Sequence, residues 1–281
     1  MTQRAELTVL VDNQAGPGCM PEHGFALWIE TKDRRILLDT GQGEALAGNA
    51  LALGMDLGRL NTLVLSHGHY DHTGAVPLVL ATALEVNVHA HAGVTEPRYS
   101  VRAGEARDIR MPAASVRALY RLPLFRMHWA SGPVSLGEGL GLTGAISRRT
   151  DFEDTGGPFF LDPEGQRPDL LEDDQALWIA TEAGLVVCLG CCHSGLINTL
   201  TYVREITGEN RIHAVIGGLH LNAASPERLE KTVNALRESR PDMLVPCHCT
   251  GEAAATYLRE NLDCPVQTGY SGFRMEIPSA S

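Results

Sequence analysis

Three histidines and an aspartate fall within six residues of this 281-residue chain, in the segment His67-Gly68-His69-Tyr70-Asp71-His72. The apolar run before it, residues 62–66, predicts a short buried strand, so the turn that follows can direct these side chains into a cleft. Burying several imidazoles and a carboxylate together is costly without a cation. We therefore predict a metal centre here, in preference to a polar loop whose histidines cap the next helix.

The spacing within the segment predicts two metal positions. His67 and His69 can point the same way on an extended turn, whereas Asp71 and His72 begin the next helix and can point at a second ion. Imidazole and carboxylate ligands suit zinc, with manganese or iron as alternatives. Two divalent ions about 3.5–4 Å apart would hold a bridging hydroxide that attacks an ester, phosphoester or amide.

The elements that must position these residues are predicted from hydrophobic periodicity and turn residues. Strands are expected at residues 7–12, 25–31, 35–39, 62–66, 85–89, 175–181, 184–189, 211–216, 243–246 and 272–277, with a further pair within 132–143. Helices are expected at residues 44–53, 73–83, 113–120, 195–207, 225–238 and 251–261. Two β-rich halves, each flanked by helices, predict an α/β (α+β) fold, a four-layer αββα sandwich. We expect one domain over residues 1–281, with an irregular segment at about 96–173 that forms a substrate wall or lid.

The His-x-His-x-Asp-His motif after a short strand resembles the metallo-β-lactamase superfamily of binuclear metallohydrolases. The upstream sequence Leu37-Leu38-Asp39-Thr40-Gly41 is similar to a strand-end Asp-Thr-Gly of that family. The resemblance implies that His67 and His69 bind one metal ion and that Asp71 and His72 bind the second. It also implies that Asp71 orients the attacking water and that Asp39 lies behind the metal-binding histidines.

The rest of the chain departs from the usual family pattern, which has a third histidine in Gly-His-Thr/Ser-x-Gly and then a bridging aspartate. Instead, three histidines each follow a predicted strand: His193 in Gly-Cys-Cys-His-Ser-Gly, His220 in Gly-Gly-Leu-His-Leu and His248 in Pro-Cys-His-Cys-Thr-Gly. Because such a sandwich gathers its site at strand ends, we predict all three as further metal ligands. Alternatively, one of them supports a ligand or contacts the substrate.

Cysteines accompany two of these histidines. Cys191 and Cys192 stand in the region of the missing aspartate, and we predict that Cys192 supports the site, although both can equally be small buried residues. Cys247 and Cys249 are expected to face away from His248, because side chains alternate along a strand. A separate structural zinc site with two cysteines and two histidines, its cysteines drawn from Cys191 or Cys192 and from Cys247 or Cys249, is a further alternative.

The series of motifs resembles one branch of the superfamily, labelled 7,8-dihydropterin-6-yl-methyl-4-(β-D-ribofuranosyl)aminobenzene 5′-phosphate synthase. We predict an enzyme, a metal-dependent hydrolase with two divalent metal ions that uses metal-bound hydroxide on a small substrate. One alternative is a non-hydrolytic synthase or transferase of pterin-type biosynthesis. Another is a di-iron redox protein on the same fold.

Charge indicates what this protein binds. The chain has 23 basic and 34 acidic residues, a formal net charge of −11 that disfavours nucleic acid as a partner. Residues 98–149 nevertheless contain nine arginines and three acidic residues. Arginine binds phosphate and carboxylate through its planar fork, so we predict an anionic small-molecule substrate held by some of these side chains, Arg148 and Arg149 among them. The alternative is a solvated arginine-rich face.

The remaining composition is that of an ordinary folded protein, with 44% hydrophobic and 20% charged residues. No apolar run is long enough to span a bilayer, and no signal-peptide pattern is present, so we expect no membrane partner. Seven cysteines, an odd number, favour a reduced compartment and a cytoplasmic location. The sequence gives no indication of the oligomeric state.

Overall fold

Two β-sheets form the centre of the structure, a computed structural model that describes residues 4–277. The first sheet has seven strands in the order β16-β1-β2-β3-β4-β5-β8. Its strands are β1 (Ala5–Val11), β2 (Ala26–Thr31), β3 (Arg35–Leu38), β4 (Thr62–Val64), β5 (Asn87–Ala90), β8 (Met127–Trp129) and β16 (Arg274–Ile277). Strands β3, β4, β5 and β8 run parallel, so their carboxyl ends meet at one edge.

The second sheet has six strands in the order β15-β14-β13-β12-β10-β9. They are β9 (Val134–Gly137), β10 (Leu140–Leu142), β12 (Leu177–Thr181), β13 (Gly184–Leu189), β14 (Ile212–Gly218) and β15 (Met243–Cys247). Strands β13, β14 and β15 are parallel and contribute a second set of carboxyl ends. Strands β12 and β13, which match the strands expected at residues 175–181 and 184–189, form a hairpin.

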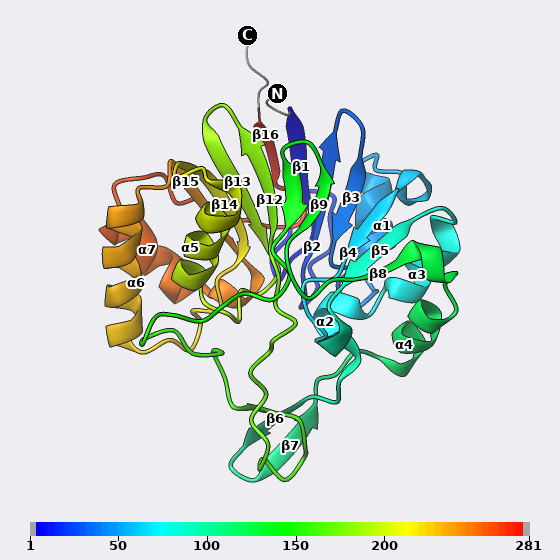
Figure 1. Cartoon of the computed structure of the whole chain (residues 1–281), viewed down its shortest axis with the longest axis horizontal. Helices are drawn as coiled ribbons and strands as arrows, with labels where there is room; N and C mark the ends of the chain where they lie inside the picture. Colours follow the sequence, from blue (N-terminus) through cyan, green and yellow to red (C-terminus); the bar gives the residue numbers. More distant parts are fainter. Residues whose placement is uncertain (1–3, 278–281) are drawn as a thin grey trace.

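Helices cover the outer faces of both sheets (Figure 1). On the first sheet lie α1 (Leu46–Ala52), α3 (Val76–Thr82) and α4 (Ala113–Tyr120), and on the second α5 (Leu196–Thr207), α6 (Pro226–Ser239) and α7 (Glu252–Asn261). Three hydrophobic clusters correspond to these layers. One, which includes Leu27, Leu38 and Ile216, fills the space between the sheets, and two others lie under the two sets of helices. This is the predicted αββα sandwich.

Local signals explain several element boundaries. The Ser225 hydroxyl accepts a hydrogen bond from the Arg228 amide and caps α6, as its position before Pro226 predicts. The helix expected at residues 73–83 is observed as α3, which has Pro77 in its first turn, and a separate short helix, α2 (Tyr70–Thr73), precedes it, with Gly74 between the two. A Cβ at Gly74 would lie 2.1 Å from the Gln42 carbonyl oxygen, so only glycine permits this close approach.

The segment expected to be irregular contains a small third sheet. Strands β6 (Tyr99–Arg102), β7 (Glu105–Asp108) and β11 (Phe159–Phe160) pair in the order β11-β6-β7. They project from the end of the sandwich at which α2 lies (Figure 1). All four residues of β7 are exposed, so this hairpin lacks the alternation of buried and exposed residues by which a strand is predicted.

Helix α4 was expected and is observed at residues 113–120. The short 3₁₀ helices are Leu57–Arg59, Ala92–Thr95, Leu124–Arg126 and His248–Thr250. Within residues 4–277, no helix is both long enough and apolar enough to cross a membrane.

Candidate metal centre and active site

The candidate site forms where strands from both sheets end. Asp39 follows β3, the His67–His72 segment follows β4, and residues 191–193, His220 and His248 follow β13, β14 and β15. Several of these positions have positive φ angles, at which residues other than glycine are strained: Asp39 (61°), Cys192 (60°), His220 (47°) and His248 (44°). Such strain is typical of functional sites, where the surrounding structure holds the backbone in place.

The turn between His67 and His69 is fixed by the surrounding protein. A Cβ at Gly68 would lie 2.1 Å from the Val94 carbonyl oxygen, so the close packing requires glycine. The Gly68 amide donates a hydrogen bond to Asp173, whose other carboxylate oxygen accepts one from the buried Arg98 guanidinium. The two histidines therefore project from a rigid turn, which limits the cost of bringing them together.

Asp39 lies behind this segment and is fully buried. Its Oδ1 accepts a hydrogen bond from the Ser66 amide at 2.7 Å, and its Oδ2 accepts from Ser66 Oγ at 2.6 Å and from His72 Nδ1 at 2.7 Å. The donor at Nδ1 fixes the tautomer of His72 and leaves Nε2 facing the site. This is the position behind the histidines that the family resemblance implies for Asp39.

His67, His69 and His193 form the first donor group, named here the three-histidine group. His67 Nε2 lies 3.0 Å from His69 Nδ1, and the His193 ring centroid lies 4.8 and 4.9 Å from those of His67 and His69. His193 Nδ1 donates a hydrogen bond to the Thr155 carbonyl at 2.8 Å, which leaves Nε2 free to bind. Of the three histidines that follow later strands, His193 is therefore the one that joins His67 and His69.

His23, Asp71 and His248 form a second group, named here the aspartate group. Asp71 Oδ2 lies 3.1 Å from His23 Nε2 and 3.5 Å from His248 Nε2. His248 Nδ1 donates a hydrogen bond to Asn13 Oδ1 at 2.8 Å, which orients its Nε2 toward Asp71. The structure places His23 and Asn13 directly at Asp71 and His248.

The histidines of the site differ in the direction in which their surroundings shift the pKa. Burial, reinforced by neighbouring positive charge, lowers the pKa of His67, His69 and His193 well below the ordinary value, so these imidazoles are neutral and able to bind a cation. Burial also opposes the charging of His72, but the Asp39 carboxylate outweighs it and raises the pKa of His72 to about 9. Despite its burial, hydrogen bonds from His23 and His248 hold the pKa of Asp71 well below its ordinary value.

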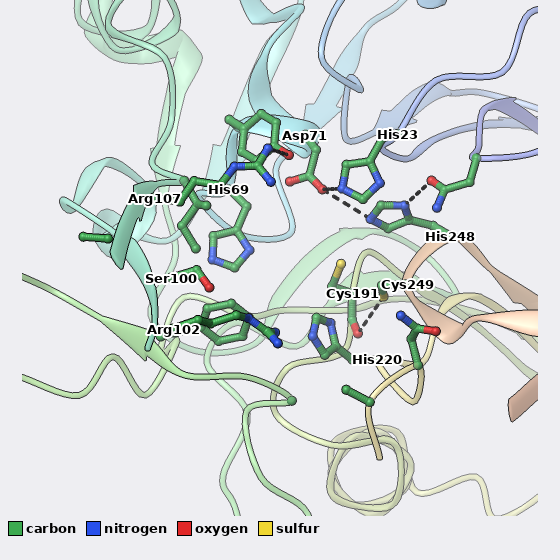
Figure 2. Close-up of a pocket in the computed structure, with 18 of the residues that line it drawn as sticks. His23, His69, Asp71, Ser100, Arg102, Arg107, Cys191, His220, His248 and Cys249 are labelled. Carbon is green, nitrogen blue, oxygen red and sulfur yellow. Dashed lines mark hydrogen bonds and ion pairs between the residues drawn. The ribbon is translucent and has the colours of Figure 1, made fainter. Parts of the chain in front are cut away.

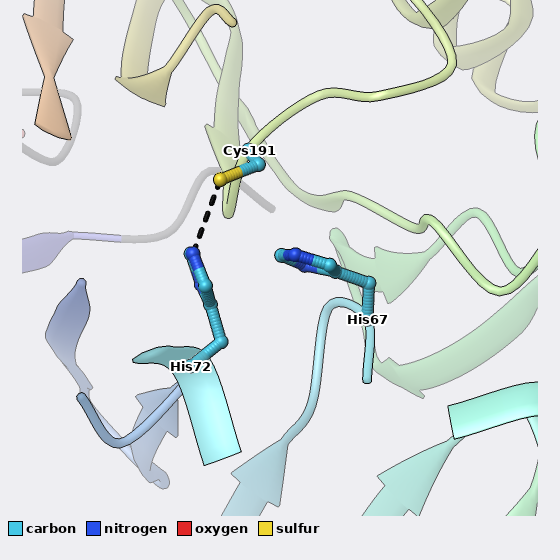
Figure 3. Close-up of side chains that lie close together, drawn as sticks. All are labelled: His67, His72 and Cys191. Atoms are coloured by element: carbon cyan, nitrogen blue, oxygen red, sulfur yellow. Dashed lines mark hydrogen bonds between the residues drawn. The ribbon is translucent and has the colours of Figure 1, made fainter. Parts of the chain in front are cut away.

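Cys191, and not its neighbour Cys192, faces the site. Cys191 Sγ lies 3.1 Å from His72 Nε2, with His67 alongside (Figure 3). Cys192 turns the other way, with its Sγ 3.4 Å from Thr199 Oγ1 and its side chain in the cluster under α5. The site therefore has a cysteine, but not the one that was predicted to support it.

The two cysteines beside His248 also differ. Cys247 packs between the sheets, whereas Cys249 lines the cavity close to Cys191 and His248. The prediction that both face away is wrong for Cys249, because β15 ends at Cys247 and a 3₁₀ turn follows, so the alternation of a strand no longer applies. Of the four cysteines considered for a structural zinc site, Cys192 and Cys247 therefore pack in the hydrophobic clusters, and only Cys191 and Cys249 lie beside His248.

A cavity of about 530 Å³ opens above these groups (Figure 2). Its lining combines metal-ligand candidates with residues of the projecting hairpin, among them His69, Asp71, His220 and His248, and Ser100, Arg102, Glu105 and Arg107. Figure 2 shows Arg102 and Arg107 on one side of the cavity and His248 and Cys249 on the other. Phe159 packs against the site, with its ring centroid 5.3 Å from those of both His69 and His193.

Arg148 and Arg149 lie elsewhere, so their positions do not support contact with a substrate in this cavity. Arg148 donates a hydrogen bond to the Leu170 carbonyl at a separate depression, and Arg149 forms an exposed ion pair with Glu205. The arginines that do line the cavity, Arg102 and Arg107, are on β6 and β7. The arginine-rich composition of residues 98–149 predicted that this segment binds the substrate, but it did not single out Arg102 and Arg107.

The donor atoms fit divalent metal ions. His69 Nε2, His193 Nε2 and His220 Nδ1 are buried and have no hydrogen-bond partner in the described part of the chain. Unpaired buried nitrogens are costly, and a cluster of histidines that contains several of them is typical of a cation site. His220 completes the cluster, with its ring centroid 4.2 Å from that of His193. The structure thus brings His67, His69, Asp71, His72, His193, His220 and His248 together, as predicted.

The fold and the site together define the class of protein. The family model of the metallo-beta-lactamase superfamily matches residues 20–197, and the chain belongs to that superfamily. A solved metal-dependent hydrolase of the beta-lactamase superfamily is 30% identical, with a TM-score of 0.80 over 97% of this chain and 99% of the other. A solved metallo hydrolase from Ignicoccus hospitalis, 14% identical, shares the fold with a TM-score of 0.57 over 99% and 100%.

A named relative comes from Methanocaldococcus jannaschii. It is the 7,8-dihydropterin-6-methyl-4-(beta-D-ribofuranosyl)-aminobenzene-5'-phosphate synthase of that organism, 28% identical over 85% of this chain and 84% of the relative. An uncharacterized protein of the same organism is 29% identical over 90% of this chain and 94% of its own length. The similarity to the named synthase agrees with the branch that the motifs of this chain resemble.

Proposed function

We propose that this protein is a metal-dependent hydrolase that acts on an ester or phosphoester of a small anionic substrate. The observation that carries the proposal is the placement of two adjacent donor groups at the base of a cavity whose opposite wall carries arginines. The similarity to a solved metal-dependent hydrolase of the same superfamily supports it.

Two divalent ions, for which zinc is the proposed identity, would be held by the three-histidine group, by two members of the aspartate group and by His72. His67, His69 and His193 would bind one ion, and Asp71, His72 and His248 the other. When bound, such ions supply Lewis-acid charge and a water molecule activated for attack at neutral pH.

The protein's own residues prepare the site for this chemistry. Asp39 and the Thr155 carbonyl fix the tautomers of His72 and His193, so the nitrogens that bind face the cavity. The low pKa of Asp71 keeps it a carboxylate that can accept a hydrogen bond from the attacking water and orient it. Phe159 covers the three-histidine group and limits access of bulk water.

Arg102 is suited to bind an anionic group of the substrate. It lines the cavity and has no carboxylate partner within residues 4–277, whereas Arg107 already donates to the Tyr70 hydroxyl at 2.7 Å. Replacing Arg102 by alanine should raise KM for an anionic ester about tenfold, because a charge-assisted hydrogen bond is worth about 1.5–3 kcal/mol. The kcat should change little.

Steady-state kinetics on an anionic ester and on a neutral ester of similar size would check this. The Arg149→Ala variant is the matched control, since its guanidinium pairs with Glu205 outside the cavity. An unchanged KM in Arg102→Ala, or an equal rise for the neutral ester, would contradict an anion-binding role.

A non-hydrolytic synthase or transferase of pterin-type biosynthesis is the second candidate. The name of the relative from Methanocaldococcus jannaschii, a synthase, favours it. A synthase would join two substrates without the net addition of water, whereas a hydrolase incorporates one solvent oxygen into its product. Both candidates use the same cavity and differ in the fate of that oxygen.

The deciding experiment starts from protein purified without added metal and without a histidine tag. About two zinc or manganese ions per chain, together with solvent ¹⁸O in the product of an ester and phosphodiester panel, would support the hydrolase. Turnover of paired substrates without ¹⁸O incorporation would favour the synthase. Two iron ions with a visible absorption band would instead indicate redox chemistry, and a folded protein that binds no metal would contradict the proposal.

A further inference from the structure

Cys191 occupies a central place among the candidate ligands. Its sulfur lies within 4.8 Å of donor atoms in three different groups, which pair it with His67 and His72, with His193 and His220, and with His248 and Cys249. No other residue within 4–277 belongs to three such groups. Cys191 Sγ is therefore next to members of both the three-histidine group and the aspartate group.

No carboxylate takes this central place. Asp71 belongs only to the group with His23 and His248, and Asp39 is engaged behind the site with Ser66 and His72. Two cations held close together repel each other, and a shared anionic ligand reduces that repulsion. Among the described side chains, the one placed between the two groups that can supply a negative charge is Cys191.

The neighbouring glycines bring Cys191 close to the other strand ends. A Cβ at Gly190 would lie 2.0 Å from Ser66 Oγ and 2.7 Å from Asp39 Oδ2, and a Cβ at Gly218 would lie 3.3 Å from the Cys191 Cα. A side chain at Gly190 would push the end of β13 away from Ser66 and Asp39, and one at Gly218 would push the end of β14 away from Gly190 and Cys191. The glycines therefore allow the sulfur to reach the 3.1 Å distance from His72 Nε2.

We propose that Cys191 is a thiolate ligand shared by the two metal positions. This inference rests on the proposed metal-dependent function and adds a soft donor to a site otherwise built from imidazole and carboxylate. On metal binding the S–H bond is replaced by metal–sulfur bonds, and the proton passes to solvent. Thiolate ligation favours zinc over magnesium, calcium or manganese.

Cobalt(II) tests the inference without any assay of activity. Thiolate bound to cobalt gives a charge-transfer absorption in the near ultraviolet that imidazole and carboxylate ligands do not give. In the wild-type protein this band should appear with the first equivalent of cobalt and should shift or grow again with the second. A band complete at one equivalent, while a second ion still binds, would overturn the shared position.

Three variants test which cysteine gives the charge-transfer band. Cys191→Ser should lose the band, whereas Cys192→Ser should retain it because its sulfur faces Thr199 in the core. Cys249→Ser should also retain it, and loss of the band in this variant alone would overturn the assignment to Cys191. Where a variant folds poorly, the wild-type titration still tests whether a thiolate is shared by the two ions, and the Cys249→Ser variant tests which cysteine supplies it.

The outcomes separate this inference from the proposed function. Two cobalt ions bound without a charge-transfer band would contradict the role of Cys191 and leave the metal-dependent hydrolase intact. Failure of the folded wild-type protein to bind cobalt or zinc would contradict both.

Discussion

Replacing Asp71 by asparagine should reduce the hydrolysis of an activated phosphodiester or ester by about 10³-fold, within the usual contribution of a positioned acid–base group. Asp71 is almost completely buried, and His23 and His248 both lie against its Oδ2. The amide keeps the shape of the side chain but removes the negative charge. It can therefore neither compensate a cation nor accept a proton from water.

The metal content of the variant shows which of the two roles dominates. Loss of one ion per chain would identify Asp71 chiefly as a ligand, and a full complement with the same loss of rate would identify it chiefly as the group that orients water. Asp108→Asn is the matched control, because Asp108 is exposed on the same side of the molecule and pairs with Arg110. Rates in Asp71→Asn that stay within a few-fold of the wild type would exclude both roles.

Replacing Asp39 by asparagine should weaken metal binding about 10–100-fold, the usual cost of removing the partner of a metal-binding histidine. Both oxygens of Asp39 accept hydrogen bonds, from the Ser66 amide and hydroxyl and from His72 Nδ1. An asparagine has only one acceptor oxygen, so one of these buried donors loses its partner. The backbone is not the cause, because asparagine tolerates the φ of 61° at this position.

The same variant changes how metal binding depends on pH. Without metal, Asp39 raises the pKa of His72 to about 9, so below that pH a metal ion must displace a proton from the imidazole. Metal affinity of the wild type should therefore rise with pH until about 9, and in Asp39→Asn this rise should end at a lower pH. Competition with a chelator over a range of pH measures both effects.

Asp56→Asn is a suitable control for this experiment. Asp56 caps a short 3₁₀ helix at the surface and has no contact with the site. An affinity in Asp39→Asn equal to that of the control would show that the orientation of His72 does not limit metal binding.

The sequence alone predicted the parts of the site that are local. Four candidate ligands lie within residues 67–72, so their proximity is independent of the rest of the fold. The strands and helices of both halves were predicted because their hydrophobic residues alternate or repeat with a clear period. Ser225 and Pro226 indicated the start of α6. The same periods predicted the four-layer sandwich, because each element has one apolar face to bury.

The tertiary structure decided which distant residues join the local cluster. His193, His220 and His248 lie more than a hundred residues further along the chain, and all three follow strands. Only the packing of the two sheets therefore shows that His193 meets His67 and His69, whereas His248 meets Asp71. It likewise places Arg102 and Arg107 at the cavity, because the hairpin that carries them has no hydrophobic pattern of its own.

The choice between Cys191 and Cys192 shows most clearly what could not be predicted from the sequence. Both follow β13, and nothing in their chemistry distinguishes them. The backbone at Cys192 adopts a φ of 60°, and this turn directs one sulfur to His72 and the other to Thr199. The sequence determined that these cysteines and histidines follow strands, and therefore lie at one edge of the sheets, because the periodicity that predicts a strand is local. Their orientation was decided by contacts between segments far apart in the chain, because the direction of a side chain at a strand end depends on the backbone turn that those contacts hold in place.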